Sequence, residues 1–133
     1  MLIAPATAES LRRHWEDGWN GRDVETILEP FSDDVVFSSP AIPKFTGDET
    51  QVAIVGLVPL RTYVEEALRR SGDVRYTVDA TYHGAETVVL VYTCHFPDGT
   101  VRPGSDLLRV DDDGRVVEWR CHYADDPTVW RPT

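Results

Sequence analysis

The segment VRYTVDATYHGAETVVLVYTCHFPDGTVRPGSDLLRVDDDGRVVEWRCHY, residues 74–123, carries the strongest structural signal in this chain. Apolar and aromatic residues alternate with polar ones from Val74 to Tyr82, a period typical of a strand with one buried face. Turn residues at Gly84, Asp98-Gly99 and Asp113-Gly114 then separate three further β-rich segments at hairpin spacing. The segment therefore predicts a four-stranded antiparallel meander.

The residues that precede this meander predict helices. Apolar residues recur at helical spacing in 7–20, in 23–30 and in a third segment that begins near Pro59 and ends at Ser71-Gly72. A short strand is expected at 35–38. The order predicts an α+β fold in which three N-terminal helices pack on a curved antiparallel sheet, forming a cone that encloses a pocket.

The stretch between Ser39 and Gly56 shows little periodicity and contains Pro40, Pro43 and Gly47. A connection of this length without regular structure is unusual inside a compact domain. A functional lid and a disordered loop both fit this pattern.

Composition limits the domain number and the partners. With 133 residues the chain fits one domain, 1–133 with a core of about 7–126, and no apolar run is long enough to span a bilayer. We expect no membrane partner and, since no secretory signal precedes the first helix, a cytoplasmic location. The formal net charge of −10 and the scattered basic residues argue against nucleic acid.

The two cysteines, Cys94 and Cys121, form no CxxC motif and are interpreted as reduced core thiols. Cys94-His95 and Cys121-His122 suggest metal ligation, but adjacent strand residues point to opposite faces, so neither pair easily chelates one ion. The sequence also lacks a nucleophile elbow and a glycine-rich phosphate loop. We expect neither a metal nor another cofactor.

Three short segments in the same order resemble SnoaL-like domains of the nuclear-transport-factor-2-like superfamily. They are WNGRD (19–23), FSDDVVF (31–37) and DGRVVEWR (113–120). The resemblance runs from about Leu11 to Asp126 and implies the cone fold. The superfamily includes ketosteroid isomerases, polyketide cyclases, limonene epoxide hydrolases, dehydratases and noncatalytic members, so the fold does not choose a function.

Asp106 is the first candidate for a catalytic residue. The resemblance places it where ketosteroid isomerases keep a protonated aspartic acid that donates a hydrogen bond to the substrate, and apolar neighbours would raise its pKa. A structural hydrogen bond is the alternative. The isomerase base position is occupied by Ser39 and its tyrosine position by Trp15, while Cys121 stands where epoxide hydrolases carry an aspartate. Both of those mechanisms are therefore doubtful here.

His95 is the candidate general base, because it shares a strand face with Val91 and Thr93 and a histidine side chain can serve as a base near neutral pH. A core or rim histidine is the alternative. A hairpin centred on Asp98-Gly99 pairs His95 with Arg102 and places Asp106 about 13 Å further along. The two groups would then lie on either side of a substrate instead of in contact.

A hairpin centred on Asp112-Asp113 sets Trp119 opposite Asp106 and Tyr123 near Arg102. Arg102 is either a receptor for an anionic group or simply solvated. The aromatic candidates suit a flat apolar ligand, although any one of them can be plain core. The predicted ligand-binding residues are Trp15, Trp19, Ser39, Tyr63, Arg102, Trp119, Cys121 and Tyr123.

Two functions follow as hypotheses. The first is a cofactor-independent isomerase, cyclase or dehydratase acting on a small hydrophobic molecule, with Asp106 as acid and His95 as base. The alternative is a noncatalytic ligand-binding or dimerisation module. Because members of the superfamily commonly pair through the outer sheet face, which here carries Val116, Glu118 and His122, we expect a homodimer.

Overall fold

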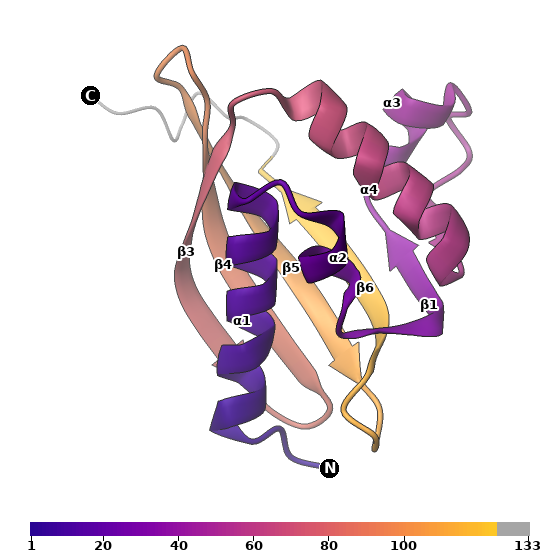
Figure 1. The fold of residues 1–133 in the computed structure, drawn as a ribbon, viewed down its shortest axis with the longest axis vertical. Coiled ribbons are helices and arrows are strands. Elements are labelled where there is room, and N and C mark those ends of the chain that lie inside the picture. Colours follow the sequence, from indigo (N-terminus) through magenta and orange to yellow (C-terminus); the bar gives the residue numbers. More distant parts are fainter. Residues whose placement is uncertain (125–133) are drawn as a thin grey trace.

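The computed structural model describes residues 1–124, which form one layer of helices on one curved, unclosed sheet (Figure 1). The predicted domain end at 126 lies outside these residues. The chain order is α1 (Pro5–Asn20), α2 (Val24–Leu28), β1 (Phe31–Ser38), α3 (Ile42–Thr46), β2 (Ala53–Val55), α4 (Leu57–Ser71), β3 (Arg75–His83), β4 (Thr87–His95), β5 (Val101–Val110) and β6 (Val116–Tyr123). The α+β prediction is confirmed.

The sheet has six strands in the order β2-β1-β6-β5-β4-β3. The meander β3 to β6 is antiparallel, as predicted, but β1 runs parallel to β6, so the sheet is mixed and the prediction of a purely antiparallel sheet is wrong. The stretch 39–56 contains α3 and the edge strand β2 and is not a structureless loop.

The helices cover one face of this sheet (Figure 1). Helix α1 packs on β3 and α4 packs on β1. Alternation along β4 buries Val88, Leu90, Tyr92 and Cys94 under the helices, and the intervening residues face outward. The core therefore lies between the concave sheet face and the helix layer, where an inward polar residue is costly unless it is hydrogen-bonded.

The end of α1 is fastened to the start of β3 by Asn20. Its side-chain amide donates to the carbonyl oxygen of Tyr76 and accepts from the Tyr76 N–H, both at 2.8 Å. The bond fixes Tyr76 next to Trp19, with ring centroids 5.9 Å apart. The end of α1 thus positions the rings of Trp19 and Tyr76 next to the start of β3.

Among residues 1–124, no helix is long and apolar enough to cross a bilayer. The same part of the chain contains no cluster of three His, Cys, Asp or Glu side chains that could hold a metal ion.

Candidate functional site: an aromatic cavity above a buried carboxyl

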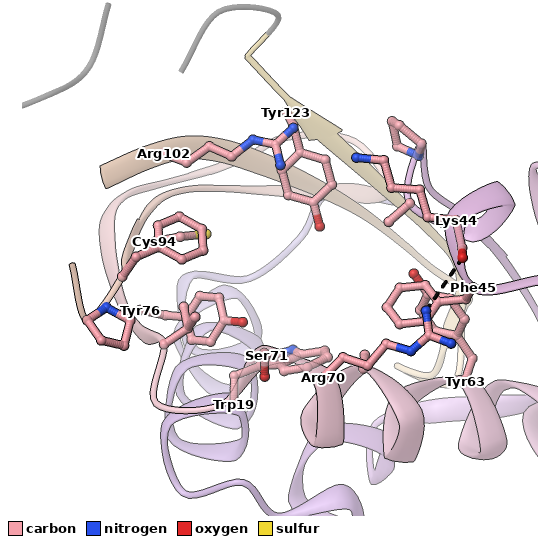
Figure 2. Close-up of a pocket in the computed structure, with 16 residues that line it drawn as sticks. Trp19, Lys44, Phe45, Tyr63, Arg70, Ser71, Tyr76, Cys94, Arg102 and Tyr123 are labelled. Atoms are coloured by element: carbon pink, nitrogen blue, oxygen red, sulfur yellow. Dashed lines mark hydrogen bonds between the residues drawn. The ribbon is translucent and has the colours of Figure 1, made fainter. Parts of the chain in front are cut away.

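A cavity of about 620 Å³ lies between α3, α4 and the ends of β3 to β6 (Figure 2). The residues that line it belong to the end of α1, to α3 and α4, and to strands β3 to β6 or the segments next to these elements. The aromatic side chains that line it are Trp19, Phe45, Tyr63, Tyr76, Phe96 and Tyr123. Pockets of this size and composition accommodate small, largely apolar molecules.

The charged residues around the cavity are all basic. Lys44, Arg70 and Arg102 line it, and the described lining includes no acidic side chain. Arg70 is held at the rim by Glu66, with its Nε 2.7 Å from Oε1, and lies over the Phe45 ring at 4.5 Å. The Arg102 guanidinium lies 4.5 Å from the centroid of the Tyr123 ring. These are favourable cation–π positions.

The other titratable groups in the lining are weak acids that stay protonated. Burial raises the pKa of the hydroxyls of Tyr63, Tyr76 and Tyr123. Burial also raises the pKa of the Cys94 thiol to about 12. The described lining contains no carboxylate and no imidazole, so none of its groups is a ready general base near pH 7.

Two buried side-chain atoms in residues 1–124 have no hydrogen-bond partner, and both belong to residues that line the cavity. They are Nε1 of Trp19 and Nε of Arg102. Trp19 is only 8% exposed. An unpaired buried donor is costly and is normally satisfied, and a small shift of either side chain toward the cavity would let its N–H meet an acceptor there.

Asp106 lies beneath this cavity, not in its wall. Its side chain is 1% exposed and is not part of the described lining. Trp15 and Trp119 each donate an indole N–H to its Oδ2, at 2.9 and 2.8 Å, and Tyr92 donates its hydroxyl to Oδ1 at 2.9 Å. We call these four residues the Asp106 cluster. Every side-chain polar atom of the cluster is hydrogen-bonded.

Burial raises the pKa of Asp106, and the hydrogen bonds from the cluster oppose that rise only in part. The lowering contributions come from Trp119, then Tyr92, then Trp15, then Cys121. Because desolvation dominates, the neutral carboxylic acid is favoured relative to an exposed aspartate. Burial thus shifts the pKa of Asp106 in the direction predicted from the sequence, but the groups that hydrogen-bond to its carboxyl oxygens are protein side chains.

A glycine makes room for the cluster. A Cβ atom on Gly104 would lie 2.6 Å from the ring of Tyr92, closer than real contacts allow. Because Gly104 has no side chain, the Tyr92 ring can lie across β5. Its hydroxyl then reaches Asp106, which is the next inward residue of β5 after Gly104. Sequence reasoning treated Pro103-Gly104 only as a bulge candidate, whereas residues 101–109 pair continuously with β4.

His95 lies on the other face of the sheet, so the prediction that it faces the pocket is wrong. It pairs with Val101, not with Arg102, and its exposed ring lies 3.1 Å from the Thr77 hydroxyl oxygen. The loop between β4 and β5, residues 96–100, contains Gly99 at φ 89° and pairs His95 one position away from the predicted register, which reverses the faces. His95 and Asp106 do not meet in one cavity.

The predicted ligand-binding residues divide into two groups. Trp19, Tyr63, Arg102 and Tyr123 border the cavity. The other four, Trp15, Ser39, Trp119 and Cys121, are buried and lie outside the described lining. Trp119 pairs with Leu108, and Cys121 pairs with Asp106, two positions from the predicted register.

Sequence reasoning missed several lining residues. Tyr76 and Cys94 were detectable, because strand alternation puts them on the buried face with Val74 and Tyr92. Lys44 and Phe45 had no such signal, since they belong to the short helix α3 within a proline-containing stretch. The missed lining residues with charged, hydroxyl, thiol or aromatic side chains are Lys44, Phe45, Arg70, Ser71, Tyr76, Cys94 and Phe96.

Comparisons with known proteins agree with this architecture. The sequence profile of the SnoaL-like domain matches residues 11–119. A crystal structure of a SnoaL-like protein of unknown function from Burkholderia thailandensis is 31% identical, with a TM-score of 0.81, and the match covers 93% of this chain and 99% of that one. No curated protein sequence matches.

More distant structures share the fold. A protein of unknown function with a cystatin-like fold from Methylobium petroleophilum is 22% identical, with a TM-score of 0.73 over 95% of this chain and 81% of that one. A Kribbella flavida protein, provisionally described as a ketosteroid isomerase, is 21% identical, with a TM-score of 0.69 over 96% and 83% of the two chains. At this identity the likeness concerns the fold.

Proposed function

Since the chain belongs to the family of SnoaL-like domains, we propose that it uses the cavity of that fold to bind a small, flat, mostly apolar molecule. The observation that carries the proposal is the aromatic cavity of about 620 Å³. Its rings expose apolar faces, while the hydroxyls of Tyr63, Tyr76 and Tyr123 add polar contacts. This combination is typical of ligand sites.

The geometry favours binding over the acid and base pair expected from the sequence. Asp106 is enclosed by its own donors, and His95 is on the outer face. General acid–base catalysis requires both groups within hydrogen-bond reach of one substrate. A ligand in the cavity would instead contact Trp19, Tyr76 and Tyr123.

Calorimetric titration with β-naphthamide, a flat neutral probe, tests this proposal. We expect saturable binding by the wild type and loss of binding in Ala67→Trp, because Ala67 lines the cavity and the larger side chain would fill it. Ala6→Trp, on the exposed first turn of α1, is the matched control. Equal affinities of both variants would place the probe elsewhere and contradict the proposal.

Proton transfer is a second candidate function, and one arrangement favours it. Cys121 pairs with Asp106 across β5 and β6, and Tyr123 is the next inward residue of β6 after Cys121. Cys121 therefore lies between the buried acid and a hydroxyl that borders the cavity. Such a chain supports an isomerase-type reaction in which Asp106 acts on the ligand indirectly, through Tyr123.

Deuterium exchange tests this second function without knowledge of the natural substrate. β-Tetralone, a flat bicyclic ketone, has acidic hydrogens next to its carbonyl, and their exchange in D₂O is followed by NMR. The proton-transfer hypothesis predicts faster exchange with wild type than with Asp106→Asn or Tyr123→Phe. An exchange rate equal to that of buffer would leave binding as the function.

A further inference from the structure

Resting on the proposed function, we infer that the ligand of this cavity carries a carboxylate, which Arg102 and Lys44 receive at one wall, while Trp19 on the opposite wall donates to a second acceptor atom of the ligand. The site would thus take a flat aromatic or polycyclic acid. The aromatic lining alone fits acidic and neutral flat molecules equally well.

The distribution of charge is the first argument. The chain has 23 acidic and 13 basic residues, so an average surface region is dominated by carboxylates. The described cavity lining has the opposite composition, with Lys44, Arg70 and Arg102 and no acid. A wall of cations in a strongly acidic protein provides a local site for an anion that the remaining surface repels.

The pairing of these cations is the second argument. Arg70 has a carboxylate partner in Glu66. The ion pairs found within residues 1–124 include neither Lys44 nor Arg102. Arg102 contacts the Tyr123 ring, an arrangement that leaves the edge of its guanidinium able to form hydrogen bonds. These two charges are therefore available to a ligand.

The unpaired donors are the third argument and are independent of charge. Trp19 Nε1 and Arg102 Nε are the buried side-chain atoms without a partner in the described chain, and both residues line the cavity. An indole N–H and a guanidinium N–H can only donate, so each requires an acceptor. Carboxylate and carbonyl oxygens supply such acceptors, whereas a hydrocarbon supplies none.

Figure 2 shows how these groups are arranged. Arg102 and Lys44 extend along one wall, on either side of the Tyr123 ring in this view, while Trp19 and Tyr76 lie on the opposite wall. A flat molecule between these walls would present its acidic end to the two cations. Its ring system would rest on the aromatic side chains.

A matched pair of probes tests the inference. β-Naphthoate and β-naphthamide have the same ring system and nearly the same size, but only the first is an anion at pH 7.5. We expect calorimetry to show the acid bound at least about tenfold more tightly than the amide, because hydrogen bonds to charged groups are stronger. We also expect affinity for the acid alone to fall as salt is raised from low ionic strength.

Two substitutions locate the effect. Arg102→Met and Lys44→Met should each lower affinity for the acid and leave affinity for the amide within about twofold, because only the anion loses a charged partner. Arg75→Met is the matched control, since Arg75 is exposed on the outer face at the same end of the sheet and its loss changes the net charge equally. It should leave both affinities unchanged.

The outcomes separate this inference from the function on which it rests. Equal affinities for acid and amide, both abolished by Ala67→Trp, would overturn the carboxylate and leave the binding site. A preference for the acid that Arg75→Met reduces as much as Arg102→Met would reflect overall charge and would also overturn it. Binding of neither probe would contradict both proposals.

Discussion

The Asp106 cluster and the cavity above it are built from the same kinds of residues but satisfy their hydrogen bonds in opposite ways. In the cluster, two indoles and a phenol surround one acceptor, and every donor is used. In the cavity, an indole and a guanidinium each keep an unused donor, and the described lining has no carboxylate to accept. The two regions touch, since the Trp15 and Trp19 ring centroids are 6.5 Å apart.

This difference indicates which region is structural and which binds. A buried polar group with all its partners in place holds the fold together, and an outside molecule can only compete with those partners. Unpaired donors beside the cavity cost stability that no group in residues 1–124 offsets. Asp106, whose pKa is raised by burial, therefore belongs to the scaffold, and the residues of the cavity form the candidate site.

The largest effect should come from removing the acceptor of the cluster. Asp106→Leu leaves two indole N–H groups and the Tyr92 hydroxyl without a partner, and we expect it to lower the free energy of unfolding by about 3–5 kcal/mol. Asp106→Asn is the control, because its carboxamide oxygen can accept from both indoles and its NH₂ can donate to Tyr92. Chemical denaturation of both variants gives the values. Equal losses would contradict this account of the cluster.

Gly104→Ala should break the cluster from a neighbouring position. The added Cβ would lie 2.6 Å from the Tyr92 ring, so the ring must move and its bond to Asp106 is strained or lost. We expect a loss of about 1–3 kcal/mol, which is typical of overpacking. Gly84→Ala is the control, because a Cβ there meets no atom within 4 Å. If both alanine variants unfold at the same denaturant concentration as wild type, the packing argument is wrong.

The pH dependence of stability should distinguish the cluster from ordinary surface carboxylates. Since burial raises the pKa of Asp106 above its usual 3.8, the folded state holds this proton more tightly than the unfolded state. The stability that results is fully present below about pH 3.8 and is lost as pH rises through the folded pKa. Asp106→Asn lacks this titration.

Denaturation curves of wild type and Asp106→Asn across this range measure the effect. The stability of the variant relative to wild type should increase as pH rises above 4, and should level off once Asp106 is ionised in the folded protein. The exposed pair of Arg61 and Glu25 offers a comparison, because Arg61 lowers the pKa of Glu25. Glu25→Gln should therefore shift the pH dependence in the opposite direction.

The smallest effect on stability should come from the cavity. Trp19→Phe removes the unpaired N–H but also part of a buried ring, and because these two effects oppose each other we expect the free energy of unfolding to change by about 1 kcal/mol or less. Binding of β-naphthamide should nevertheless weaken about three- to tenfold if Trp19 donates to its carbonyl. Trp15→Phe is the contrasting variant, because its N–H is used by Asp106, and it should lower stability instead.

Local patterns predicted most of the elements but little of how the site is assembled. Helical spacing identified α1, α2 and α4, and the Asp-Gly pairs identified the hairpins. The parallel pairing of β1 with β6 joins residues about eighty positions apart and has no local signal. The same is true of α3, whose Lys44 reaches the cavity from a stretch that showed no periodicity.

Two register errors show why the site was only partly predictable. The β5–β6 register was wrong by two, and a shift of two preserves the face, so Asp106 and Trp119 still proved to be neighbours. The β4–β5 register was wrong by one, which moved His95 to the outer face. The homodimer and the cytoplasmic location stay predictions, and light scattering of the purified protein would measure the first.

The parallel contact between β1 and β6 also determines when the binding site can exist. Strand β6 is the final described strand to leave the ribosome, yet it lies between β1 and β5 and carries Tyr123 into the cavity. Pairings between distant segments form slowly, because the intervening chain must first be ordered. We therefore expect nascent chains that stop before residue 116 to leave the facing edges of β1 and β5 unpaired, so that the core closes and the cavity forms only after β6 has been synthesised.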